Sequence, residues 1–168
     1  MPDSTLLFSE ILDLVHKAKT RNQKVEILRK NNTSALRMVI KASFDPNIVW
    51  IMPKGDVPFT PNEATAGTEH TRLATEAKKL YRFIRGGDNA TPQFKKEQMF
   101  LQLLEGLHIS EAKLICDAKD KKLHQTYKGL SANVVREAFG WDENFMQMDL
   151  DAYPQGSRYA SGMIDEPI

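Results

Sequence analysis

Apolar residues recur along most of this chain at spacings of three and four, which place their side chains on one face of an α-helix. Polar residues such as Ser9 and Glu10 fill the intervening positions. The pattern predicts three helices before Asp45. Their inward positions are Leu7, Ile11, Leu14 and Val15; Val25 and Leu28, between Asn22 and Lys30; and Leu36, Val39 and Ile40, after a cap at Thr33 or Ser34.

The pattern stops between Asp45 and Gly67, where prolines and glycines exclude a long helix. We expect this crossover to lie over the helices, anchored by Trp50 and Phe59. Its apolar run from Ile48 to Met52 is either a short extended piece or a segment that packs against the bundle. A connection this long in a compact domain is either functional or partly mobile.

Helical spacing resumes near Thr71 and again after Thr91-Pro92, because proline is tolerated in a first helical turn. Ser110 is expected to cap a further helix, and Ser131 a last short one that ends at Gly140. The apolar positions of these helices are Leu73, Ala77, Leu80 and Ile84; Phe100, Leu103, Leu104 and Leu107; Leu114, Ile115 and Ala118; and Val134, Val135 and Phe139.

The chain of 168 residues, 41% of them hydrophobic, can bury the core of one domain. We therefore predict an all-α fold, a compact multi-helix bundle with a long Pro/Gly-rich crossover loop and an extended acidic C-terminal tail. The expected division is a helical domain over residues 1–140 and a tail over residues 141–168.

Charge is distributed unevenly along the chain. The stretch from Lys17 to Lys41 contains eight Lys or Arg and one acid, a net of +7, although the whole chain carries only +1. Residues 141–168 contain six acids and one base, Arg158, a net of −5. The near-neutral total thus combines a basic body with an acidic tail, and a localised basic surface is typical of proteins that bind polyanions. The candidate contacts in the basic stretch are Lys24, Lys30, Arg37 and Lys41.

A second basic segment, from Lys119 to Gly129, is expected to form a loop that leads into the last helix. Ser131 at the start of that helix leaves backbone N–H groups where a phosphate oxygen would meet a partial positive charge. Gly129 has no side chain to block a close approach, and Lys121, Lys122 and Lys128 would add positive charge.

No motif for catalysis or cofactor binding is present, so we expect a non-enzymatic protein without a cofactor. The single cysteine, Cys116, excludes an internal disulfide and a thiolate metal cluster. The four histidines show no metal-ligand spacing, and phosphate-binding G-x-x-x-x-G-K-[ST] and G-x-S-x-G motifs are absent. Without a long apolar run or a secretory signal, a cytoplasmic location is expected.

The order of these segments resembles the helical DNA-binding domain that precedes the catalytic core of ATP-dependent DNA ligases, particularly the small phage type. The resemblance covers roughly residues 7–140. The matching pieces are Lys24-x-x-Ile27-Leu28-x-Lys30-Asn31, Leu36-x-x-Val39, the aromatic crossover from Ile48 to Gly55, Phe100-x-x-Leu103-Leu104, Lys122-Leu123, Gly129-Leu130-Ser131 and Val134-Val135.

The resemblance implies the DNA-binding part of a ligase without its catalytic domain. Ligases attach AMP to the lysine of a Lys-x-Asp-Gly motif, and this tetrapeptide does not occur here. The first hypothesis is therefore a non-enzymatic, phage-type protein that grips duplex DNA, intact or nicked, through its backbone phosphates. A phage-encoded protein of this kind would act in the host cytoplasm or belong to the virion.

The second hypothesis is a structural or adaptor protein, either a virion component or a binder of a host factor. Its basic face would then meet an acidic protein surface. The tail admits three interpretations: a loosely attached terminus, a self-inhibitory segment that shields the basic face, or a partner-binding motif. The motif would consist of Met163, Ile164, Asp165 and Glu166, which combine apolar and acidic side chains.

Overall fold

The computed structural model describes residues 6–64 and 70–148, and in these ranges the chain forms helices without a β-strand. The all-α prediction is confirmed. None of the helices described is both long and apolar enough to cross a membrane. The elements are α1 (Phe8–Lys17), α2 (Arg21–Lys30), α3 (Ser34–Phe44), α4 (Leu73–Glu76), the 3-10 helix η2 (Ala77–Phe83), α5 (Gln93–Gly106), α6 (Ile109–Lys119), α7 (Leu123–Thr126) and α8 (Ala132–Phe139).

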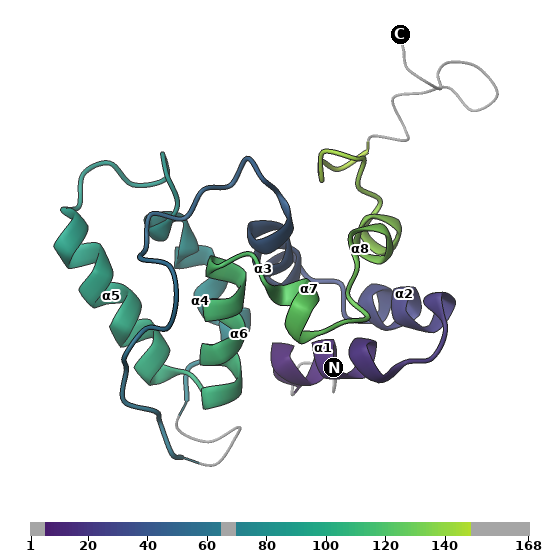
Figure 1. Ribbon diagram of the computed structural model, residues 1–168, viewed down its shortest axis with the longest axis horizontal. Coiled ribbons are helices and arrows are strands. Elements are labelled where there is room, and N and C mark those ends of the chain that lie inside the picture. The colour runs from purple at the N-terminus through teal and green to yellow at the C-terminus, as the bar shows by residue number, and fades with distance from the viewer. Residues whose placement is uncertain (1–5, 65–69, 149–168) are drawn as a thin grey trace, which may run out of the picture.

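The helices are arranged along one long axis, as Figure 1 shows, with α5 at one end and α2 and α8 at the other. The central helices α3 and α6 pack against each other, and α6 also contacts α5 and α1. Helix α2 packs on both α1 and α8, so the last described helix contacts the N-terminal part of the bundle. The buried apolar residues form one cluster that includes members of every helix.

Side-chain caps explain where α2 and α3 begin. The Thr20 hydroxyl accepts the backbone N–H of Gln23, and the Gln23 side chain accepts the N–H of Thr20 in return, which is a capping box. Thr33 accepts the N–H of Leu36 in the same way at the start of α3. The expected third helix and its cap at Thr33 are thus confirmed.

One expected core position on α1 is wrong. Leu14 is 47% exposed, whereas Leu12 is completely buried in its place. The face of α1 that packs on α2 and α6 therefore runs through Ile11, Leu12 and Val15.

The described part of the crossover, residues 45–64, lies over the helices, as expected, and passes in front of α5 in Figure 1. Trp50 anchors it by donating its indole N–H to the carbonyl of Ala42 at 2.9 Å. Trp50 also forms an isolated antiparallel bridge with Ile84, so this piece is locally extended and packs against the bundle as well.

Two boundaries after the crossover differ from the prediction. The helix expected from Leu73 to Ile84 is one α-turn followed by the 3-10 helix η2, and Ile84 lies beyond its end. Helix α6 begins at Ile109 rather than after Ser110, because the His108 ring accepts the N–H of Ser110 and acts as the cap. The loop expected after Lys119 also contains the short helix α7.

The last helix has the predicted ends: the Ser131 hydroxyl accepts the N–H of Val134, and Gly140 adopts a left-handed conformation. Beyond Gly140, where the tail was expected to begin, the chain continues to pack on the helices. Trp141 and Phe145 are only 6% and 7% exposed and belong to the apolar core. Residues 141–148 thus form part of the folded body, because their aromatic side chains cover the end of α3 beside α8.

Candidate nucleic-acid interface

The structure separates the predicted DNA-contacting residues into those that point into the fold and those that remain at the surface. Lys121 belongs to the first group. Its amine donates to the carbonyl oxygens of Ala42, Asp45 and Ile48 at 2.9, 2.8 and 2.6 Å. Burial lowers the pKa of Lys121 in this cage. The expected phosphate contact by Lys121 therefore has to be corrected, because this lysine caps the end of α3.

Lys41 is also engaged with the protein itself. Its amine donates to the carbonyl oxygen of Phe145 and lies 3.3 Å from the carboxylate of Asp45. The same amine stands 5.7 Å from the centre of the Trp141 ring, within the range of a cation–π contact. Lys41 thus holds residues 141–148 against α3.

Four predicted residues from distant parts of the sequence meet at one corner. Lys24 of α2 lies against Gly129, since a Cβ atom at Gly129 would stand 2.7 Å from Lys24 Cε and 2.8 Å from the carbonyl oxygen of Val15. The half-buried Lys24 amine also donates to the carbonyl oxygen of Ala18 at the end of α1. Only glycine allows this approach of the loop to α1 and α2. Lys128 is exposed beside it. We call this surface the basic corner and define it as Lys19, Lys24, Lys128, Gly129 and Ser131.

The start of α8 adds hydrogen-bond donors to the basic corner. Ser131 uses its hydroxyl to cap the N–H of Val134 at 3.2 Å. Within the described ranges, the backbone N–H groups of Gly129, Ser131, Ala132 and Asn133 have no hydrogen-bond partner. Free N–H groups at a helix start, together with adjacent lysines, are the arrangement that binds phosphate oxygens in many proteins.

A comparison with known protein families gives one match. A family of unknown function, DUF6433, matches residues 11–125, which is more than half of the chain. The chain belongs to this family. No curated protein and no solved structure matches it, so the comparisons provide no link to DNA ligases. The DUF6433 match includes Lys24 but ends before Lys128, Gly129 and Ser131.

Two residues at the basic corner of this DUF6433 protein, His16 and Lys19, were not predicted from the sequence as site residues. His16 at the end of α1 accepts the backbone N–H of Lys128 through Nδ1 at 2.9 Å, which fixes the loop. Lys19 lies in the turn between α1 and α2, and its side chain is exposed without a partner among the described residues. Its place in the basic stretch was a signal, but only the fold shows that this turn faces the Lys128 loop.

Lys30 and Arg37 lie away from the corner, around the junction of α2 and α3. Lys30 is exposed, and Arg37 donates to the side-chain oxygen of Asn32. Arg37 shares the outer face of α3 with three other residues, and we call this face the α3 stripe: Ser34, Arg37, Met38 and Lys41. Lys122 is exposed at the start of α7 and has no side-chain partner among the described residues.

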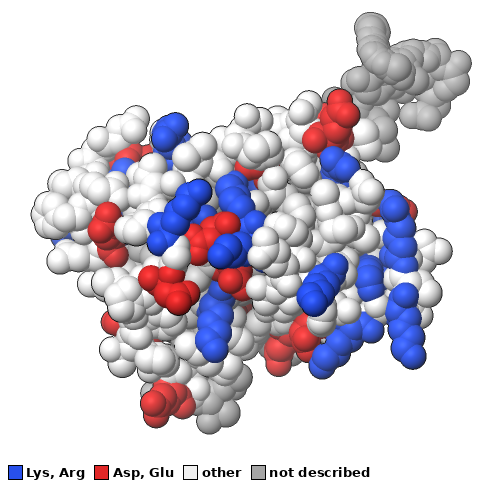
Figure 2. All heavy atoms as spheres, viewed as in Figure 1, with Lys and Arg blue, Asp and Glu red and all other residues white. Residues whose placement is uncertain are grey.

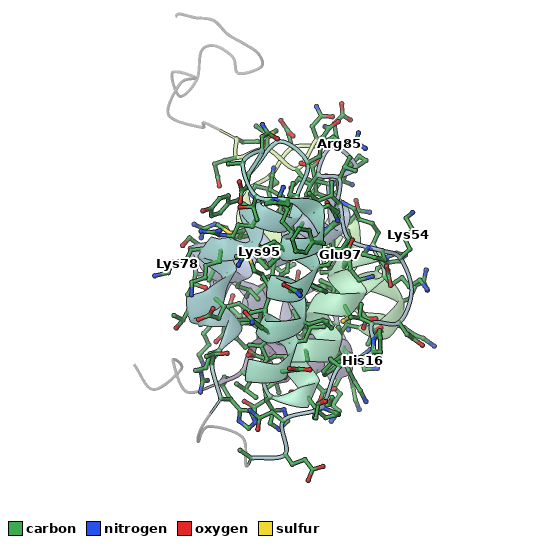
Figure 3. The ribbon with its side chains drawn as sticks, turned by 90° about the vertical axis from the view of Figure 1, so that its left-hand side faces the viewer. His16, Lys54, Lys78, Arg85, Lys95 and Glu97 are labelled. Atoms are coloured by element: carbon green, nitrogen blue, oxygen red, sulfur yellow. The ribbon has the colours of Figure 1, made fainter. Side chains whose placement is uncertain are left out.

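At one end of the molecule, exposed positive charge is little offset by acidic residues. Figure 2 shows Lys and Arg side chains along its right-hand side, over α1, α2 and α8, with few acidic side chains among them. Two of these bases are paired: Lys17 with Asp13 at 2.9 Å and Arg21 with Glu137 at 2.6 Å. At the opposite end, Lys78 and Lys95 are separate exposed lysines, labelled in Figure 3.

Other candidate chemistry is sparse in the described ranges. The rings of His70 and His108 pack edge to face with their centres 5.2 Å apart. No group of histidine, cysteine or acidic residues among those described could hold a metal ion. Burial raises the pKa of Cys116 to about 11, so its thiol remains protonated at neutral pH. The expected partner-binding residues Met163, Ile164, Asp165 and Glu166 lie outside the described residues.

Proposed function

We propose that this protein binds duplex DNA through its backbone phosphates and that the basic corner is the centre of the contact. The observation that carries the proposal is the meeting of Lys24, Lys128 and the start of α8 at one surface, from segments about a hundred residues apart in the sequence. Lys30 and Arg37 extend the positive surface toward α3, and Lys122 lies just before α7. Lys41 and Lys121 serve the fold instead.

This geometry favours phosphate binding over the reading of bases. Lysines and backbone N–H groups position a protein on a duplex, but such contacts carry no sequence information. Besides Lys24 of α2, the basic corner is formed by a turn, a loop and a helix start, whose lysines and backbone N–H groups suit phosphate oxygens. We therefore propose weak sequence specificity and a strong dependence on salt.

The resemblance to the DNA-binding domain of phage-type ligases supports the same proposal and adds a preference for nicked duplex. Gly129-Leu130-Ser131 belongs to that resemblance and lies in the basic corner. Since the chain has no Lys-x-Asp-Gly motif, the proposed role is to hold DNA and not to seal it.

The test is fluorescence anisotropy with nicked and intact duplex over a series of salt concentrations. The charge-removing variant K19Q/K128Q changes two exposed lysines of the basic corner. Its matched control, K78Q/K95Q, removes the same charge from η2 and α5 at the other end of the molecule. We expect the corner variant to lower the slope of log K against log salt by about 1.8, that is 0.9 for each lost phosphate contact.

The control should leave that slope within the error of the unmodified protein. Equal slopes for the two variants would contradict the basic corner as the DNA contact. An absence of binding by the unmodified protein at about 50 mM salt, where non-specific binding is still strong, would contradict DNA binding altogether.

A structural or adaptor role is the second candidate, and the exposed methionines favour it. Met38, Met146 and Met148 are 41%, 55% and 41% exposed. Methionine is flexible and adapts to different partner surfaces, so such residues are common at protein interfaces. Under this alternative, substitution of Met146 and Met148 by Lys would abolish a protein contact but preserve DNA binding.

A further inference from the structure

The α3 stripe ends at a pocket lined by apolar residues, by the uncharged polar residues of the α2–α3 turn and by one lysine. At the start of α3, a pocket of about 370 Å³ is formed between α1, the α2–α3 turn and α4. Its apolar floor includes Leu6, Phe8 and Ile11, and Lys30 lies on its rim. No acidic residue lines it. An occupant with apolar side chains and negative charge would complement both the floor and the rim.

The other end of the α3 stripe is already covered by the chain itself. Phe145 packs on Phe44 with ring centres 6.1 Å apart, and Lys41 donates to the carbonyl oxygen of Phe145. Met146 Sδ lies 3.5 Å from the same lysine amine. Met148 itself donates its N–H to the carbonyl oxygen of Gly140 at 2.9 Å, next to Trp141, whose ring centre lies 5.7 Å from the Lys41 amine. The chain beyond Met148 therefore starts between the end of α8 and the Lys41 end of the α3 stripe.

We propose that residues 149–168 fold back along the α3 stripe and that Met163, Ile164, Asp165 and Glu166 occupy the pocket beside Lys30. The segment carries four acids and one base, a net of −3, against a stripe and rim that contain Arg37, Lys41 and Lys30. Met163 and Ile164 supply the apolar side chains that the floor requires, and the two acids that follow meet the basic rim.

The length of the connection permits this path. Lys41 and Ser34 are seven residues apart on α3, so the stripe is about 10 Å long at 1.5 Å per residue. The 14 residues from 149 to 162 have a root-mean-square span of about 20 Å as a flexible chain. The attachment gives the motif an effective concentration in the millimolar range, which favours binding to its own pocket over a second molecule.

The consequence is a self-masked basic surface. A docked segment would cover Lys30 and Arg37 and thereby weaken the DNA contact. This effect on DNA depends on the proposed function, whereas the docking itself does not. The test must therefore detect docking directly, without DNA.

The direct test places the photo-crosslinking residue p-benzoylphenylalanine at position 164 of the full chain. After irradiation, mass spectrometry should find crosslinks within one chain to residues 6–11 or 30–35, at a yield that does not change on dilution. The same probe at position 95, on α5, should give none of these crosslinks. Crosslinks to other regions, none at all, or crosslinked dimers whose yield falls on dilution would each overturn the proposal.

A substitution in the pocket tests whether the segment docks at this site. Ala74 lines the pocket, and Ala74→Trp should fill it and abolish the crosslinks from position 164. Ala90→Trp, in the exposed turn before α5, should preserve them. Crosslinks that persist at full yield in Ala74→Trp would contradict this pocket as the docking site.

A separate measurement of DNA affinity then tests whether the docked segment masks the basic surface. A millimolar effective concentration and a weak motif give a docked-to-free ratio of about 1 to 10, so Ile164→Lys should tighten DNA binding roughly 2- to 10-fold at low salt. If crosslinks form and DNA binding is absent, the docking stands and the proposed function fails. If DNA binds and the crosslinks are absent, the docking fails and the proposed function stands.

Discussion

At the scale of single residues, Glu111 joins three helices through one buried carboxylate. The residue is only 1% exposed, and its two oxygens accept the backbone N–H groups of Phe8 at 2.8 Å and Leu73 at 2.9 Å. These groups belong to the first turns of α1 and α4, whose donors have no partner within their own helices. A side chain at the start of α6 thus caps two other helices.

Glu111 should make stability depend on pH. Burial raises its pKa above the ordinary value of 4.5, in opposition to the bonds from Leu73 and Phe8. The folded protein therefore holds this proton more tightly than the unfolded chain. The free energy of unfolding should consequently fall as pH rises from about 4.5 through the folded-state pKa. Urea unfolding of the unmodified protein and of E111Q over pH 4 to 8 should show this decline only in the former, and parallel curves would contradict it.

Lys121 and Lys122 are neighbours in sequence with different expected effects on stability. The Lys121 amine satisfies three carbonyl oxygens around the end of α3, whereas the Lys122 amine is exposed. K121M should lower the free energy of unfolding by about 2–3 kcal/mol, because buried carbonyls lose their partner. K122M should change it by less than about 0.5 kcal/mol. Thermal or urea unfolding compares the two, and equal values would rule out the capping role of Lys121.

The sequence could not distinguish these two kinds of lysine. Three lysines direct their amines to backbone carbonyls that are distant in the sequence. Lys96 donates to the carbonyl of Asp88, Lys119 to those of Pro53 and Gly55, and Lys121 to those around the end of α3. A lysine of this kind has no local signature, since its acceptors are distant in the chain. Charge counting therefore located the basic end of the molecule but overestimated the number of free amines.

At the scale of elements, two substitutions at the start of α8 should distinguish the effect of the helix cap on stability from its effect on phosphate binding. The Ser131 hydroxyl caps the helix and stands at the basic corner. Ser131→Ala should cost about 1 kcal/mol of stability through the lost cap. Ser131→Asp keeps a capping oxygen and so should retain stability, but its negative charge should weaken DNA binding in anisotropy measurements. A gain in DNA affinity on Ser131→Asp would be incompatible with phosphate at this helix start.

Helix ends were predicted well because they depend on local chemistry. Thr33, Ser131 and Gly140 act as the sequence indicated. The 3-10 helix was missed, although Ala77, Leu80 and Phe83 are three residues apart, the spacing at which side chains eclipse in a 3-10 helix. Over two turns this spacing hardly differs from that of an α-helix. The distinction is made by packing against α3 and α5, which the sequence does not contain.

At the scale of the whole molecule, the boundary of the folded body is a measurable quantity. A chain that ends after residue 140 loses Trp141 and Phe145 and leaves Lys41 without its carbonyl partner. Burial of two large aromatic side chains contributes about 1.5–3 kcal/mol each. This truncation should therefore lower stability by about 3–6 kcal/mol, which corresponds to a fall in Tm of roughly 10 °C or more for a chain of this size.

A chain that ends after residue 148 keeps these contacts and serves as the control. It should differ from the full chain by only about 0.4–1.4 kcal/mol, since a tail that docks with a ratio of about 1 to 10 adds RT ln(1 + K) to the free energy of unfolding. Calorimetry of the three lengths distinguishes the two boundaries. Equal melting of all three would restore residue 140 as the end of the folded body. A loss of stability confined to the shortest chain would place that end after residue 148.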